Sequence, residues 1–349
     1  MNTTRFVRLL PSLALLGIGL ATLPGFAQAP PAHERIAYVT LDYETRTTTL
    51  SMADPDGGNA VTLLTDGFFS FPAWSPDGRQ LAFIGSVRPY DDPALWLMNS
   101  DGTGLHTVLP EGRTVPDPLC AVWSPDGTQF LFSADTGIGG YYFYVVNVDG
   151  SGMERHQFRG IPSGMEGVPG DLVWPCATWS PDGQQIAVLG RGDGYPPGQL
   201  YVSTLDGASA APFPATTPAG TTYHQLVWSP DGERVVLYVL PGSGGNMETV
   251  PMAVASADGS VVEARIGGPP NLPGSAAWSP DSQQIVFVAN EQGVESMPGG
   301  DLWVASAGGS NVHTLSIEAN IANLGTSWGL IPGDIVLPTA PISFAEAAG

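Results

Sequence analysis

The side chains best suited to chemistry stand just ahead of a recurring tryptophan. Tyr223 and His224 precede Trp228 by five and four residues, and His224 is the only histidine so placed. An imidazole beside a phenol and a carboxylate such as Asp171 could perform acid–base chemistry on a sugar, or simply hold a polar ligand. The same residue types are common in ordinary loops, so the pattern leaves a structural interpretation open as well.

Polar and aromatic residues occupy comparable positions elsewhere in the chain. We expect them to gather at one mouth of a central channel, where they could form a pocket for a sugar, a peptide or a cation. The candidate ligand-binding residues are Asp117, Asp171, Trp174, Tyr223, His224, Asn271 and Asn323. A glycan lyase or hydrolase would need a denser cluster of His, Arg, Tyr or carboxylates, so no catalytic residue is assigned.

The sequence contains no motif for a metal site or for a serine hydrolase. No two of the five histidines share metal-ligand spacing, which argues against zinc. Calcium held by loop carboxylates stays open as a cofactor, although no Asp-x-Asp-x-Asp-Gly loop occurs. The absence of Gly-x-Ser-x-Gly argues against a peptidase of the α/β-hydrolase type. We therefore expect a chain without cofactor and without catalytic activity.

The two cysteines occupy one position in consecutive repeats. Cys120 lies three residues before Trp123, and Cys176 lies three residues before Trp179. An exported chain meets an oxidising compartment, which favours a disulfide between them. Equivalent Cα atoms on neighbouring strands would lie ~7–9 Å apart, whereas a disulfide requires ~4.4–6.8 Å. Two small buried thiols are therefore the alternative.

Charge and the N-terminal sequence indicate export. The chain has 12 Arg, no Lys and 33 acidic residues, for a net charge of −21, which disfavours nucleic acid as a partner. Residues 1–29 resemble a signal peptide, with Arg5 and Arg8, an apolar stretch over 9–23, and Ala27-Gln28-Ala29 at the cleavage region. Cleavage after either alanine fits, and an uncleaved anchor is the alternative. No later stretch is apolar for long enough to span a bilayer, so we expect a periplasmic or extracellular protein without a transmembrane segment.

These residues are positioned by a repeat of about 50 residues. Its tryptophans are Trp74, Trp123, Trp179, Trp228, Trp278 and Trp328. Ser-Pro-Asp-Gly follows the first four, Ser-Pro-Asp-Ser follows the fifth, and the pattern is lost after the sixth. The turn aspartates are Asp77, Asp126, Asp182, Asp231 and Asp281. Pro, Asp and Gly suit successive positions of a tight turn, and an Asp-Gly pair follows later in most units.

Each unit reads as four antiparallel strands, which is a propeller blade. Residues 35–39 match a second strand, so we expect the missing first strand to come from around Trp328 and to close the ring. This predicts an all-β, six-bladed propeller over 35–338, after a short linker at 30–34 and before a tail at 339–349. Residues 335–337 resemble one strand too many, which keeps seven blades as the minority alternative.

The WSPDG repeats, the Asp-Gly hairpins and the opening sequence RIAYV resemble the TolB-type propeller family. The resemblance covers residues 35–331 and implies the fold. TolB has an additional N-terminal domain that contacts its Tol partners, and only residues 30–34 lie between the signal peptide and the first strand here. The resemblance therefore implies a TolB-like scaffold without implying the Tol-specific role.

The strand order separates two faces of the ring. The Ser-Pro-Asp-Gly and Asp-Gly turns share one regular face, and the loops of variable length share the other. Variable loops on a rigid scaffold are where recognition usually lies. We expect a non-catalytic scaffold that binds a protein or a peptidoglycan or glycan component of the cell envelope; the alternative is a carbohydrate-active enzyme, lyase or hydrolase, at the channel mouth.

Overall fold

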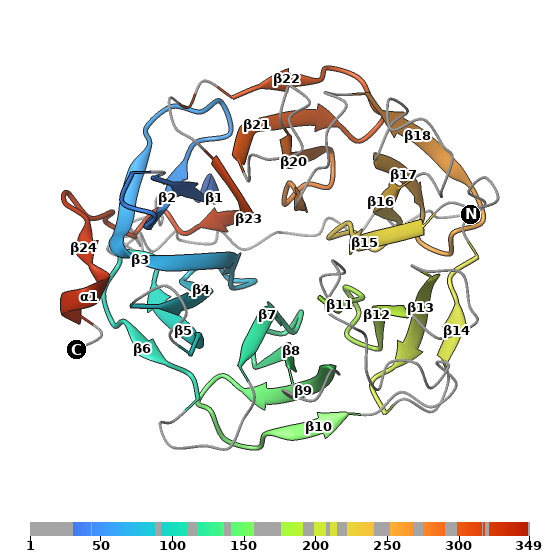
Figure 1. The fold of residues 1–349 in the computed structure, drawn as a ribbon. Helices are drawn as coiled ribbons and strands as arrows, with labels where there is room; N and C mark the ends of the chain where they lie inside the picture. Colours follow the sequence, from blue (N-terminus) through green and yellow to red (C-terminus); the bar gives the residue numbers. More distant parts are fainter. Residues whose placement is uncertain are drawn as a thin grey trace, which may run out of the picture.

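The computed structural model is a β-propeller, with antiparallel strands arranged around a central opening (Figure 1). The structure describes residues 31–42, 44–87, 92–109, 117–135, 141–156, 176–190, 199–206, 210–214, 222–240, 252–267, 275–289, 299–315, 317 and 321–347. Within these ranges the chain is all-β except for the four-residue helix α1 (Phe344–Ala347). No helix in the described part is long and apolar enough to cross a membrane.

Three sheets have four antiparallel strands each, hydrogen-bonded in chain order. The first contains β7 (Pro118–Trp123), β8 (Gln129–Asp135), β9 (Tyr141–Asn147) and β10 (Glu154–His156). The second contains β11 (Thr178–Trp179), β12 (Gln185–Gly190), β13 (Gln199–Thr204) and β14 (Ala210–Pro212). The third contains β15 (Thr222–Trp228), β16 (Arg234–Leu240), β17 (Met252–Ser256) and β18 (Val262–Ile266). These are the four-stranded blades that the repeat predicts.

The remaining strands join into one twelve-stranded sheet. Its first members are β1 (His33–Leu41), β2 (Thr48–Ala53), β3 (Val61–Trp74), β4 (Gln80–Ser86), β5 (Ala94–Asn99) and β6 (His106–Thr107). The others are β19 (Ala276–Trp278), β20 (Gln284–Ala289), β21 (Gly299–Ser306), β22 (His313–Thr314), β23 (Ile321–Ile331) and β24 (Ile342–Ser343). Hydrogen bonding therefore groups the described strands into four sheets, where the repeat alone suggests one sheet per tryptophan.

Two features merge these strands into one sheet. The single strand β3 pairs with β2 through its first part and with β4 through its last part, so it has no loop where a blade boundary is expected. It bends where Asp66 and Phe71 adopt positive φ values of 59° and 51°. In addition, Gly299 and Gly300 of β21 pair with the start of β23.

The two ends of the propeller meet in one sheet, as predicted. Strand β1 pairs antiparallel with β23, from His33 opposite Ile331 to Tyr38 opposite Thr326. The chain thereby supplies the inner strand of its first unit from its C-terminal part. Pairing the two ends removes two sheet edges that would otherwise be exposed.

The core lies between adjacent blades, and the repeat tryptophans are part of it. All six are at least nine-tenths buried. Trp179, for example, packs with Leu131 and Val145 of the preceding blade and with Ile186 of its own. The indole Nε1 of Trp123 donates to the Ala73 carbonyl at 3.0 Å, and Nε1 of Trp278 donates to the Val227 carbonyl at 3.0 Å. These hydrogen bonds link neighbouring blades.

Residues 335–337, which resemble a strand in sequence, form none in the structure. Ile335 and Leu337 are partly buried against the core beside β3 instead. The chain then continues into β24, which pairs in parallel with β3, and into α1. The tail expected at 339–349 is thus packed on the propeller over its described residues.

Candidate functional site

The regular face of the ring uses its carboxylates to build turns. In the first Ser-Pro-Asp-Gly turn, Gly78 has a φ of 67° and donates its N–H to the Ser75 carbonyl at 2.8 Å. Asp77 Oδ1 accepts from the Ser75 hydroxyl at 2.7 Å and from the Arg79 N–H at 3.0 Å. The equivalent aspartates of the other four turns accept the same pair of bonds. These carboxylates stabilise the backbone of their own turns.

Their pKa values are lowered by these same contacts. The hydrogen bond from the preceding serine hydroxyl is the main cause of the lowered pKa of Asp77, Asp126 and Asp182. In the turn between β17 and β18, the Ser256 hydroxyl and the Ser260 N–H and hydroxyl lower the pKa of Asp258 to about 2. Among the described residues, no three His, Cys, Asp or Glu side chains are close enough together to hold a metal ion.

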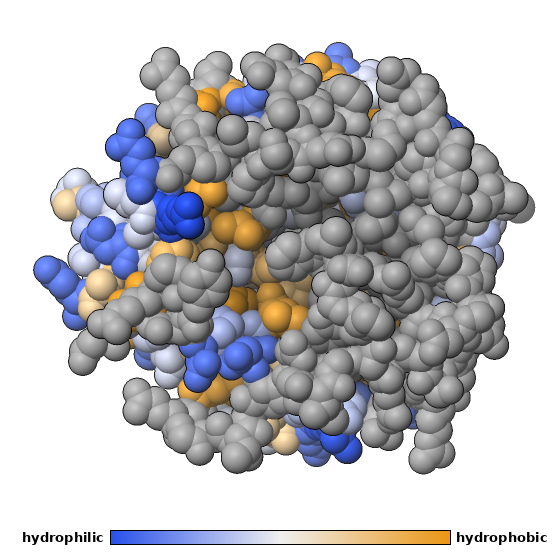
Figure 2. All heavy atoms as spheres, viewed as in Figure 1, coloured by the Kyte–Doolittle hydropathy of each residue, from blue (hydrophilic) through white to orange (hydrophobic). Residues whose placement is uncertain are grey.

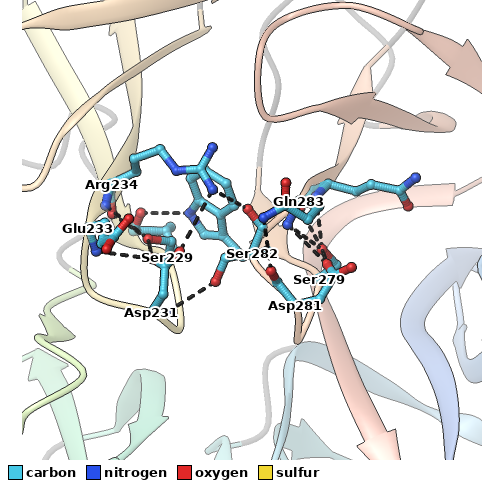
Figure 3. A network of polar contacts seen from close by, with 11 residues as sticks. Ser229, Asp231, Glu233, Arg234, Ser279, Asp281, Ser282 and Gln283 are labelled. Carbon is cyan, nitrogen blue, oxygen red and sulfur yellow. Dashed lines mark hydrogen bonds and ion pairs between the residues drawn. The ribbon is translucent and has the colours of Figure 1, made fainter.

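One pair of neighbouring turns is linked by side chains (Figure 3). Ser282 stands where the other turns have Gly, with a φ of 60°, and its Oγ accepts from the Asp231 N–H at 3.1 Å. Arg234 occupies a position where the other turns have Gln; its Nη2 donates to the Ser282 carbonyl at 2.6 Å, and its guanidinium lies 5.4 Å from the Trp278 ring centroid. These hydrogen bonds join two neighbouring blades on the regular face, so we assign Arg234 and Ser282 a structural role.

At the opposite end of the inner strands the strand pairing is irregular. The register shifts there occur at similar distances before the repeat tryptophans. The register shifts between Ser70 and Ala73 in β3, between Pro118 and Cys120 in β7, and between Tyr223 and Gln225 in β15. Between β1 and β23 it shifts from Thr326 to Ile321. Each shift lies within a few residues before the repeat tryptophan, away from the Ser-Pro-Asp-Gly turn and next to the variable loops. Bulges of this kind re-aim side chains and are frequent beside functional sites.

The bulges of β3 and β23 pack closely against each other at two residues with positive φ values. Phe71 has a φ of 51°, which a bulky residue rarely adopts. Gly325 of β23 has a φ of 113°, and a Cβ there would lie 2.7 Å from the Phe71 Cα. Phe71 and Leu324 are partly buried, and apolar surface is visible beside the central opening over β3, β7 and β23 (Figure 2). Sequence reasoning missed Phe71, Leu119 and Leu324. The signal that points to them is their place shortly before a repeat tryptophan, three residues ahead for Phe71 and four for the other two.

Four of the seven sequence-predicted ligand residues lie at or beside these bulges. Asp117 is exposed and directly precedes β7. The structure describes the backbone of the other three: His224 is the extra residue in the β15 bulge, Tyr223 adjoins it, and Asn323 lies in the irregular part of β23. Asp171, Trp174 and Asn271 fall outside the described residues. The gathering of all seven into one pocket remains a prediction.

The cysteine pair lies at the same level. Cys120 follows the β7 bulge and is buried, and it forms a disulfide with Cys176, which precedes the two-residue strand β11. The two Cα atoms are 5.8 Å apart, closer than expected for equivalent positions on adjacent inner strands. This separation is within the range that a disulfide requires. The bond links two blades next to the candidate site.

Comparison with known proteins identifies the kind of propeller. No family model matches the chain. A segment of 70 residues is 41% identical to the uncharacterized peptidase YuxL of Bacillus subtilis (strain 168), covering 20% of this chain and 10% of that protein. A segment of 103 residues is 33% identical to the Tol-Pal system protein TolB of Anaeromyxobacter dehalogenans (strain 2CP-C), covering 29% of this chain and 22% of that protein. The chain thus spans less than a quarter of the length of these relatives.

Solved structures extend the similarity over most of the chain. The TolB crystal structure from Acinetobacter baumannii has a TM-score of 0.64 and 22% identity, covering 84% of this chain and 66% of that one. The putative TolB from Agrobacterium tumefaciens has a TM-score of 0.59 and 18% identity, covering 87% of this chain and all of that one. The molecule is a β-propeller of four-stranded antiparallel blades. Its resemblance to TolB-type propellers, predicted from the repeat, is confirmed in the fold.

Proposed function

We propose that this chain is an exported, non-catalytic scaffold that binds a protein of the cell envelope at the variable-loop end of its inner strands. The recurrence of backbone bulges at that end, in β3, β7, β15 and β23, is the observation that carries the proposal. The opposite ends of these strands finish in regular turns whose aspartates are engaged locally. Backbone bulges at one end of an otherwise regular ring are suited to binding a partner at that end.

We also propose that the ring has six blades. The three four-stranded sheets supply three of them. The twelve-stranded sheet divides into three more. One contains β23, β1, β2 and the first part of β3, the next contains the last part of β3 with β4, β5 and β6, and the third contains β19 to β22. The β21–β23 pairing then joins two neighbouring blades. Each resulting blade then contains one repeat tryptophan, on β3, β7, β11, β15, β19 or β23.

The envelope assignment rests on sequence and on the relatives. The first 29 residues have the pattern of a signal peptide, and a net charge of −21 is unsuited to nucleic acid. The relative from Anaeromyxobacter is named as a protein of the Tol-Pal system. We infer a periplasmic location and a protein partner, with a peptidoglycan or glycan component as the second choice.

Affinity capture with matched variants tests the proposed surface. The mature protein, immobilised through an engineered tag, should retain a defined envelope protein from a solubilised envelope fraction. Asp117→Ala combined with His224→Ala alters the bulged end. Gln184→Ala alters an exposed turn residue whose side chain donates, among the described residues, to the Asp182 carbonyl of its own turn. We expect the double variant to lose at least tenfold in capture and the control to lose none. Equal capture by all three proteins, or a loss confined to the control, would refute the proposed surface.

Carbohydrate chemistry is the second candidate, favoured by the position of His224 in the β15 bulge next to Tyr223. A bulge can turn both side chains of such a pair into a shared site. A screen of envelope glycans for new reducing ends or unsaturated products tests it. Turnover abolished by Tyr223→Ala and by His224→Ala, with folding retained, would favour the enzyme over the scaffold.

A further inference from the structure

The C-terminal segment, residues 332–347, runs from the inner strand β23 to the outer rim of the propeller, where β24 and α1 lie beside β3 at the left of Figure 1. Asp334 forms an ion pair with Arg79 at 3.4 Å. Pro338 and Ile342 then pass over the turn between β5 and β6, because a Cβ on Gly102 would lie 3.6 Å and 3.3 Å from their side chains. Val336 is 81% exposed, so part of this path is held by few contacts.

The segment adds a strand to a sheet edge. Ile342 pairs with Leu64 and Ser343 with Thr65, in parallel. Leu64 also pairs with Leu50 of β2 on the other side of β3. The first part of β3 is therefore the outer strand of its blade, and β24 extends that blade by one short strand. Strand addition to a free edge is a common way to bind an extended peptide.

A single aromatic side chain anchors the segment. Phe344 is fully buried, and its ring centroid lies 5.0 Å from Phe69, 6.0 Å from Phe83 and 4.9 Å from Trp96. The interplanar angles of 85°, 66° and 74° are those of edge-to-face contacts. The three partner rings come from β3, β4 and β5, so the pocket is made entirely by the propeller.

The pocket depends on a missing side chain. A Cβ on Gly67 would lie 2.8 Å from Phe344 Cδ1 and 2.6 Å from Phe69 Cζ. Gly67 therefore provides the space that Phe344 fills. Phe344 thereby completes the buried cluster that contains Phe69 and Phe83. A strand edge at Leu64 and Thr65, next to a pocket for one aromatic ring, has the form of a peptide-binding groove.

We propose that the edge of β3 and the Phe69–Phe83–Trp96 pocket form a peptide-binding site, which the chain's own C-terminal segment occupies. The ligand is an extended peptide that pairs with Leu64 and Thr65 and inserts one phenylalanine. Because β24 lies off the path of strands that forms the ring and pairs only with β3, the segment can leave the groove while the ring stays folded. Its effective concentration is on the order of millimolar, so it suppresses binding of a free peptide. This site lies on the rim, and it is independent of the proposed envelope-binding surface.

Titration of full-length protein with a fluorescein-labelled peptide of residues 336–347 tests this site. Phe344→Ala in the protein removes the anchor and should free the groove. We expect saturable binding of the peptide to this variant, and binding at least tenfold weaker to the wild type, since the tethered segment competes. The same peptide with its phenylalanine replaced by alanine should not bind. Val336→Ala, in the same segment but exposed, is the matched control and should behave as wild type.

Folding is checked for each protein by far-UV circular dichroism, and Phe344→Leu provides a milder variant if Phe344→Ala does not fold. A folded variant that fails to bind the peptide would overturn the proposal. So would binding that is equal for variant and wild type, or that does not depend on the peptide's phenylalanine. Loss of folding in both variants would also overturn it, because an exchangeable segment must leave a folded propeller behind.

Discussion

Two repeat tryptophans differ in an indole hydrogen bond, and this difference predicts how each tolerates replacement by phenylalanine. Trp179 and Trp278 are both buried, at 8% and 4% exposure. The Trp278 indole N–H donates to the Val227 carbonyl at 3.0 Å, whereas the Trp179 indole N–H has no partner in the described part of the chain. Trp278 also lies 5.4 Å from the Arg234 guanidinium, a contact that the ring of a phenylalanine can still make. We compare Trp179→Phe with Trp278→Phe.

The magnitude follows from that difference. Both substitutions remove the same atoms, so the cavity left behind contributes a similar cost to each. Trp278→Phe also removes a hydrogen bond worth about 1 kcal/mol, whereas Trp179→Phe removes a buried donor without a partner, whose desolvation costs at least about 1 kcal/mol. We therefore expect Trp278→Phe to lower the free energy of unfolding by about 2 kcal/mol more than Trp179→Phe. Truncation by Trp179→Ala should cost ~3–5 kcal/mol, because it empties an inter-blade site.

Urea unfolding followed by far-UV circular dichroism measures both variants, since the method does not depend on the fluorescence of the substituted residue. Transitions of equal slope allow the midpoints to be converted into free energies. A Trp179→Phe variant at least as destabilised as Trp278→Phe would refute the hydrogen-bond argument. A loss below ~1 kcal/mol for Trp179→Ala would show that this side chain is not part of the core.

Three further predictions concern covalent, ionic and turn contacts. Cys120 and Cys176 should both resist alkylation in the absence of reductant, as measured by mass spectrometry of freshly purified protein, and their loop of 56 residues should contribute ~4 kcal/mol; two alkylated cysteines would contradict this. The lowered pKa values of the turn carboxylates, down to about 2 for Asp258, mean that their stabilisation is present above the unfolded pKa near 4 and is lost as pH falls towards 2. The melting temperature should therefore fall over this interval, less steeply in Asp258→Asn, and a flat profile would argue against the turn contacts. Arg234→Gln removes the bond to the Ser282 carbonyl, and Ser282→Gly removes the bond that the Ser282 hydroxyl accepts from the Asp231 N–H. Because both bonds join the same two turns, the two losses should be non-additive in a double-mutant cycle, with a coupling of about 1 kcal/mol; strictly additive losses would show that the two bonds act independently.

The sequence by itself determined that the fold is a propeller of four-stranded antiparallel blades, because this fold is built from a repeated local unit. Ser-Pro-Asp-Gly fixes a tight turn through the φ of Pro, the hydrogen bonds of Asp and the positive φ of Gly, and each of these is local. The phase of the first unit, which begins at a second strand, was enough to predict that β1 pairs with β23. The level shared by Cys120 and Cys176 was also readable from their equal distance to a tryptophan.

Tertiary structure alone decided the features that depend on how strands meet. The bulges at Leu119 and His224 are mismatches between two strands, so neither strand's sequence contains them. The pairing of the single strand β3 with both β2 and β4 depends on bends at Asp66 and Phe71, where non-glycine residues adopt a backbone that local preference disfavours. The burial of Phe344 depends on space left by Gly67, 277 positions earlier in the chain. Contacts at such separations are fixed by packing of the whole ring, which a local pattern does not encode.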